Sequence, residues 1–139
     1  MPHAEAPPGL RPLPKGRVAL DMAQAGIQGL ARMGEHWGLT VDQQRVLLGG
    51  LPKTTYYAML KGEVRSVSPD TLERLSLLLG IWGNLEILLP NPPSADRWMD
   101  RIHPDPRFGG HTPLEWMLQG TVTALLEVRR YLEAWRFGL

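Results

Sequence analysis

Proline and glycine divide this chain into short segments, and those segments carry apolar residues at three- and four-residue steps. The 139 residues include 15 glycines and 13 prolines. Proline lacks the N–H that a helix interior or a sheet ladder needs, and left-handed glycine commonly ends a helix. No alternating strand pattern of useful length and no coiled-coil heptad run is present. The sequence therefore predicts an all-α fold.

Composition and charge limit the function classes. Hydrophobic residues make up 43% of the chain and charged residues 21%, which is typical of a packed core. The absence of cysteine excludes disulfides and thiolate metal sites, and no apolar run reaches the roughly 18 residues of a membrane helix. We expect a cytoplasmic protein without a cofactor. The net charge of +1 excludes a polybasic coat but allows a local basic patch.

The first half of the chain is predicted to begin with a proline-rich arm at residues 1–15, extended or disordered, and then a helix from Arg17 to Trp37. Gly26, Gly29 and Gly34 lie within this helix. Each weakens it by about 1 kcal/mol relative to alanine, so the helix is either shorter or in close contact with another helix there.

The following segments carry recognisable helix starts and stops. Thr40 and Gln43 form a capping-box pair, and Pro52 suits the first turn of the next helix. Gly80 is the predicted end of a helix that starts at Ser68. The predicted helices up to the next boundary are 41–48 (Val46, Leu47 and Leu48 buried), 52–61, 69–80 (Leu72, Leu75, Leu78 and Leu79 buried) and 81–89.

A proline cluster at residues 90–93 is the clearest boundary, and it separates a domain at 16–90 from one at 91–139. Residues 103–110 are too rich in proline and glycine to be regular. Thr112 and Glu115 form a second capping-box pair, so Glu115 is interpreted as a cap and not as a catalytic acid. The predicted helices of this domain are 94–102, a short one between Thr112 and Gly120, and a long last one with Leu125, Val128, Leu132 and Trp135 as its stripe.

Helices 41–48 and 52–61 have the length and the glycine-containing turn of a helix-turn-helix unit, whose second helix enters the major groove of DNA. An ordinary helical hairpin with a solvated polar face is the alternative. Adjacent tyrosines point about 100° apart, so one of Tyr56 and Tyr57 is expected to pack inward. The candidate DNA-binding residues are Gln43 and Gln44 at the start of the first helix, Lys53, Thr54, Thr55, Tyr57 and Lys61 on the second, and Arg65 beyond it.

Two stretches resemble a known family. Residues 37–57 followed by 72–76 resemble the helix-turn-helix of Xre-like antitoxins. Residues 109–117, Gly-Gly-His-Thr-Pro-Leu-Glu-Trp-Met, resemble the C-terminal toxin-binding domain of the Xre/MbcA/ParS family. The resemblance implies a type II antitoxin that blocks a RES or related ADP-ribosyltransferase-like, NAD-consuming toxin. It also implies binding to its own promoter, usually as a homodimer.

The resemblance places toxin binding in segment 109–115 and the last helix. The arginines of the last helix either form a solvated face or insert their guanidinium groups into the toxin pocket that binds the pyrophosphate of NAD. Residues 137–139 are expected to form a free tail. Trp98, Trp116 and Trp135 suit either a core or an interface. The candidate toxin-binding residues are Phe108, Gly109, Gly110, Thr112, Arg129, Arg130, Arg136 and Phe137.

No catalytic constellation is visible, so we expect no enzyme. His103, Asp105 and His111 are close in sequence, but prolines separate them and a fourth ligand is missing, so no metal site is predicted. Two alternatives to the antitoxin interpretation remain open. One is a stand-alone dimeric transcription regulator whose C-terminal part serves only dimerisation, and the other is a helical adaptor that binds no DNA.

Overall fold

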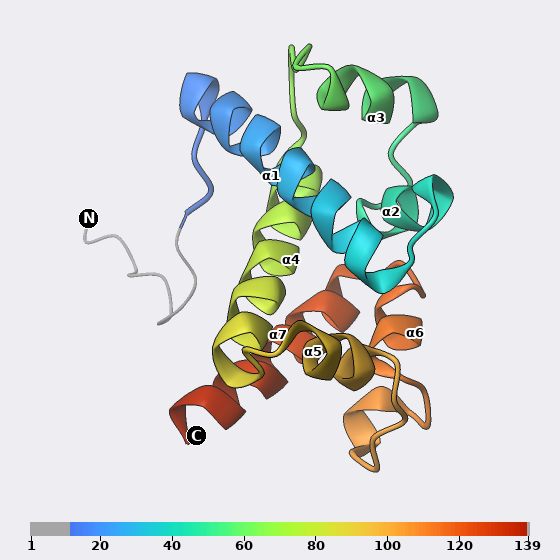
Figure 1. Cartoon of the computed structure of the whole chain (residues 1–139). Helices are drawn as coiled ribbons and strands as arrows, with labels where there is room; N and C mark the ends of the chain where they lie inside the picture. The colour runs from blue at the N-terminus through green and yellow to red at the C-terminus, as the bar shows by residue number, and fades with distance from the viewer. Residues whose placement is uncertain (1–11, 139) are drawn as a thin grey trace, which may run out of the picture.

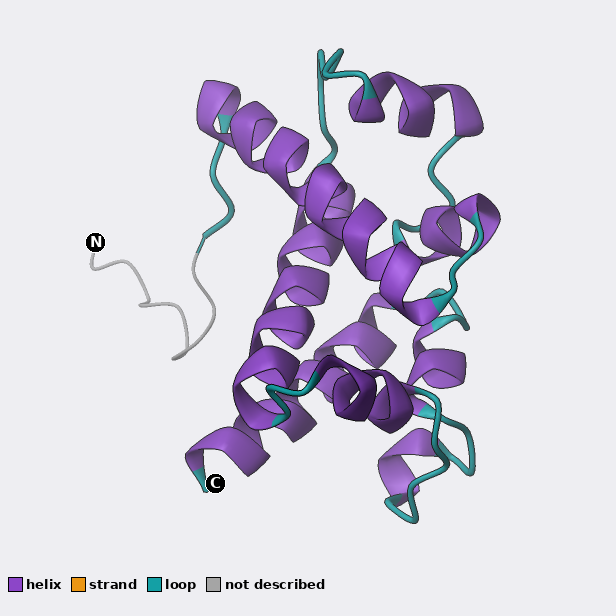
Figure 2. Ribbon diagram, in the orientation of Figure 1, coloured by secondary structure: helices purple, strands orange, loops and turns teal. Residues whose placement is uncertain are grey.

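The computed structural model describes residues 12–138, and it is all-helical within that range, which confirms the predicted fold class (Figure 2). Residues 1–11 of the predicted arm and Leu139 lie outside the described residues. The elements are α1 (Gly16–Trp37), α2 (Val41–Leu47), α3 (Lys53–Leu60), α4 (Pro69–Leu88), α5 (Pro92–Met99), a 3-10 turn η1 (Pro106–Phe108), α6 (Pro113–Met117) and α7 (Val122–Phe137).

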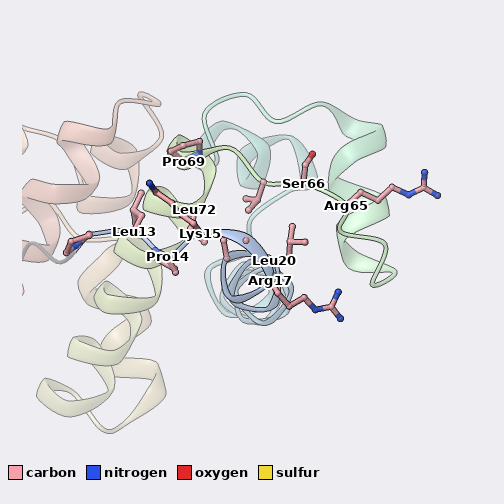
Figure 3. A pocket seen from close by; sticks show the side chains of 13 residues that line it. Leu13, Pro14, Lys15, Arg17, Leu20, Arg65, Ser66, Pro69 and Leu72 are labelled. Carbon is pink, nitrogen blue, oxygen red and sulfur yellow. The ribbon is translucent and has the colours of Figure 1, made fainter.

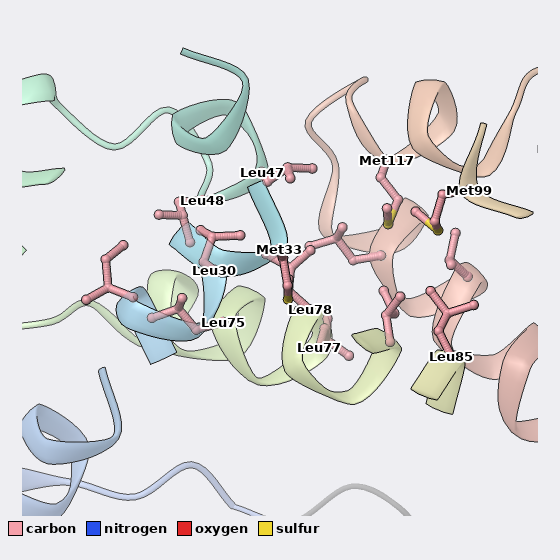
Figure 4. Close-up of a cluster of buried hydrophobic side chains, with 14 of the residues drawn as sticks. Leu30, Met33, Leu47, Leu48, Leu75, Leu77, Leu78, Leu85, Met99 and Met117 are labelled. Carbon is pink, nitrogen blue, oxygen red and sulfur yellow. The ribbon is translucent and has the colours of Figure 1, made fainter. Parts of the chain in front are cut away.

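Helix α4 is the axis of the molecule (Figure 1). Helix α1 crosses α4 and carries α2 and α3 on its other side, and α7 packs most extensively against α4, with α5 and α6 beside it. Buried side chains from α1, α2, α4, α5 and α6 meet in one cluster, and α7 completes it (Figure 4). The two halves of the chain therefore share one hydrophobic core.

The prediction that Gly80 ends a helix is wrong, because α4 runs without a break from Pro69 to Leu88. A Cβ atom at Gly80 would lie 3.0 Å from Nε of Arg129, so the missing side chain lets α7 approach closely. The Asn84 side chain also donates to the Gly80 carbonyl at 2.9 Å. Burial of Ile81 and Leu85 outweighs a glycine cost of about 1 kcal/mol.

The glycines of α1 mark close contacts and do not shorten the helix, which spans 22 residues. A Cβ at Gly26 would meet the Leu75 side chain, and one at Gly34 would meet Gln44. The helix ends where Gly38 adopts φ 66°, a left-handed cap. The interpretation of these glycines as contact points is confirmed.

Several predicted details of packing need correction. The prediction that Val46 and Leu79 are buried is wrong, because each is partly exposed at the edge of a contact, Val46 beside Gly120 and Leu79 beside Gly29 of α1. Trp135 is 46% exposed, because it lies in the last turn of α7 at the edge of a surface groove. Phe137 belongs to α7 and Gly138 caps that helix, so these two residues are not a free tail.

Boundaries differ by small amounts elsewhere. Pro52 is the N-cap of α3 and not its first helical residue, α5 ends at Met99, and the segment predicted as irregular contains the single turn η1. Within residues 12–138, no helix combines the length and the apolar character needed to cross a bilayer.

Candidate functional site

The turn between α2 and α3 is fixed by its own hydrogen bonds. Gly49 and Gly50 have φ of 83° and 84°, which favours glycine at both positions. The Gly50 N–H donates to the Arg45 carbonyl at 2.8 Å, and Nε of Arg45 donates to the Leu51 carbonyl at 2.6 Å. Asp42 holds the same guanidinium at 2.8 Å. The two helices therefore have a defined relative orientation.

A buried hydrogen bond sets which face of α3 is exposed. Tyr56 is 2% exposed and its hydroxyl donates to Oε1 of Gln44 on α2 at 2.5 Å. Tyr57 is 42% exposed, so one tyrosine points inward and the other outward, as predicted. Burial raises the pKa of the Tyr56 hydroxyl, and Tyr57 adds to the rise. Gln28 on α1 donates to the Leu60 carbonyl and so anchors the end of α3.

This hydrogen bond corrects one DNA-binding prediction. Gln44 is only 6% exposed, because it lies on the inner face of α2 between Gly34 and Tyr56, so its side chain does not reach a phosphate. Gln43 accepts the Thr40 N–H in the predicted capping box, which is confirmed. Only the amide NH₂ group of Gln43 remains for a phosphate.

The other candidate DNA-binding residues are exposed, and three of them share a groove. Thr54, Thr55 and Arg65 line a shallow groove of about 330 Å³ between α3 and the segment that follows it. No side chain caps the N-terminus of α3, so its first N–H groups have no partner within the helix. The exposed candidates are Lys53, Thr54, Thr55, Tyr57, Lys61 and Arg65.

The start of α6 is a complete capping box. The Thr112 hydroxyl accepts the Glu115 N–H, and the Glu115 carboxylate accepts the Thr112 N–H, both at 3.0 Å. Hydrogen bonding of the Glu115 carboxylate, first to the Thr112 backbone N–H and then to the Thr112 side chain, lowers the pKa of the Glu115 carboxyl. Thr112 is therefore a buried structural residue and not a free contact. Gly109 and Gly110 are exposed, with φ of 57° and 83°, and form the turn that precedes this box.

Phe108 is not available to a partner in this structure, which corrects its prediction as a toxin contact. Its side chain is fully buried. The ring lies 5.3 Å from that of Tyr131 and 6.3 Å from that of Trp98, measured between centroids. Phe108 instead holds the loop before α6 against α5 and α7.

The three candidate arginines of α7 do not meet in one site. Arg129 pairs with Glu133 at 2.7 Å and lies over Gly80 of α4. Arg136 donates to the Asn84 side chain at 3.2 Å. Both therefore face α4. Arg130 is exposed on another side of α7 and has no ion-pair partner among residues 12–138.

A basic aromatic groove of about 230 Å³, which was not predicted from the sequence, lies between α5 and the end of α7. Its lining contains two arginines and a histidine but no carboxylate. Nε2 of the histidine lies 2.9 Å from the Trp98 carbonyl. The four-residue step from Arg97 to Arg101 was a visible signal, but the position of Trp135 beside them was not. The lining residues are Leu89, Ser94, Arg97, Trp98, Arg101, His103 and Trp135.

Two of the residues that lie close in sequence as possible metal ligands, His103 and Asp105, have structural roles. His103 contacts the Trp98 carbonyl, and the Asp105 carboxylate accepts the N–H of Arg107 at the start of η1. Among the described residues, no group of three histidine, cysteine or acidic side chains is placed to hold a metal ion.

The fold and these surfaces define a class: a small helix-turn-helix protein with a second helical domain for a partner. Residues 16–80 match the antitoxin Xre-like helix-turn-helix domain, and residues 84–138 match the antitoxin Xre/MbcA/ParS C-terminal toxin-binding domain. The chain belongs to the Xre/MbcA/ParS antitoxin family. The two matches meet within α4, and neither domain is that of a known enzyme family.

A curated relative covers nearly the same span. The chain is 38% identical over 114 residues to "Uncharacterized protein y4oB" of Sinorhizobium fredii. The alignment covers 82% of this chain and 86% of that relative. The similarity therefore extends through both domains.

Proposed function

We propose that this protein is a type II antitoxin that inhibits a RES or related ADP-ribosyltransferase-like, NAD-consuming toxin and represses its own operon as a homodimer. The observation that carries the proposal is the combination, on one core, of an exposed recognition helix and a separate basic aromatic surface. The two surfaces lie on different helices, so toxin and DNA need not compete for the same side chains.

The DNA half of the proposal depends on α3. Thr54 and Thr55 can reach base edges or a thymine methyl, and Lys53 can bind a phosphate or a guanine. One recognition helix with a net charge of +1 on the whole chain binds a half-site weakly, and dimerisation supplies the missing affinity by linkage.

Band-shift titrations with the upstream promoter test this half. Alanine at Thr54 and Thr55 should relax specificity by about 1–3 kcal/mol per lost base contact. Alanine at Lys53 or Lys61 should weaken binding to every duplex and flatten its salt dependence. Arg101→Ala removes an exposed arginine far from α3 and is the matched control. Unchanged operator affinity in a folded Lys53, Thr54 and Thr55 triple alanine variant contradicts the proposal.

The toxin half depends on the outer side of α7 and the glycine turn before α6. Arg130 offers an unpaired guanidinium fork, which suits the pocket that holds a pyrophosphate. Trp135 offers a half-exposed ring at the edge of the basic aromatic groove. Aromatic and arginine side chains dominate binding energy at protein interfaces. Gly109 and Gly110 permit close backbone approach.

The test is co-expression with the product of the adjacent gene, co-purification, and an assay of NAD consumption. The Arg130→Ala, Trp135→Ala double variant should bind the toxin more weakly and restore NAD consumption. Arg32→Ala, an exposed arginine on α1, is the matched control. Full inhibition by the folded double variant contradicts this assignment of the toxin surface.

Light scattering, capture of the adjacent gene product and promoter binding together separate the antitoxin from the two alternatives. A dimer that co-purifies with the toxin and binds the promoter supports the proposal. A dimer that binds DNA but captures no product of the adjacent gene supports the stand-alone regulator. A protein without salt-dependent promoter binding supports the adaptor.

A further inference from the structure

We infer that the DNA-binding surface extends beyond the helix-turn-helix to the start of α1, where Lys15 and Arg17 bind backbone phosphates that flank the recognition helix. This inference rests on the proposed operator binding. It adds a second element to the footprint and names its ligand as the phosphodiester backbone, which positions a protein without reading sequence.

Two grooves that share one wall connect these regions. The groove beside α3 is lined by Thr54, Thr55, Arg65 and Ser66, among others. A larger groove of about 710 Å³ lies between the start of α1 and the segment before α4, and Arg65 and Ser66 line it as well. Arg65 therefore stands between the recognition helix and the start of α1, and the surface is continuous across it.

The larger groove has a one-sided charge. Its lining includes Lys15, Arg17 and Arg65 and no acidic residue. The Arg17 and Arg65 side chains extend from its rim toward the same side, to the right in the close-up (Figure 3). Because the whole chain carries a net charge of only +1, three cations around one groove are a local concentration. A groove wall with apolar side chains such as Leu13 and Leu72 also screens these charges less than open water does.

The cations are available to a ligand. Lys15 and Arg65 have no ion-pair partner among the described residues, and all three side chains are exposed. Arg17 lies 3.3 Å from Asp21, but both side chains are more than half exposed, at 84% and 67%. Such an exposed ion pair contributes little to stability, so a phosphate can replace the Asp21 carboxylate beside Arg17.

The backbone at the start of α1 supports the same ligand. Lys15 is the N-cap of α1 and its side chain makes no capping hydrogen bond. The first N–H groups of the helix therefore have no partner within the helix, and the helix dipole favours an anion there. Cationic side chains and free N–H groups thus occur together in the groove at the start of α1, whose lining reaches Arg65.

The test is a salt series of operator binding with the Lys15→Ala, Arg17→Ala double variant of the full chain. Each lost phosphate contact should lower the slope of log affinity against log salt by about 0.9, or about 1.8 in total. The loss should be equal for the operator and for a scrambled duplex. Asp21→Asn, which frees Arg17, should strengthen binding to both. Arg32→Ala, on the same helix but outside the groove, should leave the slope unchanged.

The outcomes separate this inference from the proposed function. Normal operator binding by the double variant, with an unchanged slope, overturns the inference and leaves the proposed function standing. An equal slope change in Arg32→Ala also overturns it, because the effect is then one of general charge. Loss of toxin capture instead of DNA affinity assigns the patch to the toxin and overturns it as well. A wild-type protein that binds no operator overturns both.

Discussion

Arg74 donates through Nη1 to the backbone carbonyl of Gly120 at 2.8 Å, and so joins the second turn of α4 to the turn before α7. The same guanidinium pairs with Asp70 at 3.0 Å. It also borders the turn of the helix-turn-helix, where a Cβ at Gly49 would lie 3.0 Å from its Nε. One buried arginine thus contacts parts of both matched domains.

Replacing Arg74 with alanine should lower the free energy of unfolding by about 2–4 kcal/mol, because Gly120 loses a donor and Asp70 loses its partner. Arg74→Lys keeps the charge but not the planar guanidinium group, so its free energy of unfolding should lie between those of wild type and Arg74→Ala. Urea unfolding followed by circular dichroism measures both. The exposed Arg97→Ala should stay within about 0.5 kcal/mol of wild type, and a similar value for Arg74→Ala would falsify the linking role.

Two glycines of α1 should respond to alanine in opposite directions. At Gly26 a Cβ would meet Leu75 at 3.4 Å, an ordinary contact, so Gly26→Ala should stabilise the protein by up to about 1 kcal/mol through helix propensity. At Gly34 a Cβ would collide with the Gln44 carboxamide, which holds Tyr56, so Gly34→Ala should destabilise it. Thermal unfolding of the two variants side by side tests the contrast, and equal shifts would contradict it.

Tyr56→Phe should cost about 1–2 kcal/mol, because the buried Gln44 carboxamide loses its hydroxyl donor. The variant should also change how the free energy of unfolding depends on pH in the alkaline range. The folded-state pKa of Tyr56 is raised above its ordinary value of 10.0, so its contribution is complete below pH 10.0 and is lost as pH rises toward the folded value. The unfolding free energies of wild type and variant should therefore differ at pH 8 and converge as the pH rises above 10. Tyr57→Phe is the control, and a parallel decline in Tyr56→Phe would refute the assignment.

Thr112→Ala should cost about 1 kcal/mol, because the Glu115 N–H loses its acceptor at the start of α6. Thr112→Ser keeps the hydroxyl and should restore most of that loss. The hydrogen bonds from Thr112 hold the Glu115 pKa below its ordinary value of 4.5, so this contribution is present above pH 4.5 and disappears as pH falls through the folded value. Glu115→Gln should remove that acid dependence. Equal stability of the alanine and serine variants at pH 7 would exclude a capping role.

Local features of this protein were predictable from the sequence because their partners lie within one helical turn. The capping boxes at Thr40 and Thr112 each join residues three apart, and both form as the spacing predicts. Left-handed Gly38 and the Gly49–Gly50 turn follow from the freedom of glycine at positive φ. The all-α fold class follows from the three- and four-residue spacing of apolar residues between the glycines that end the helices.

Tertiary structure decided the features that depend on helices far apart in the chain. The sequence predicts that Gly80 ends a helix, but α7 packs against Gly80 and α4 continues through it. The sequence predicts Gln44 and Phe108 as surface contacts. Both are buried, because the neighbours against which α2 and the loop before α6 pack decide which of their side chains face inward. The basic aromatic groove combines Arg97 and Trp135, which are distant in sequence. Sequence spacing determined where the capped helices α2, α4 and α6 begin. Burial of side chains between helices decided which residues remain free to meet a partner, because that burial depends on all the packed helices together.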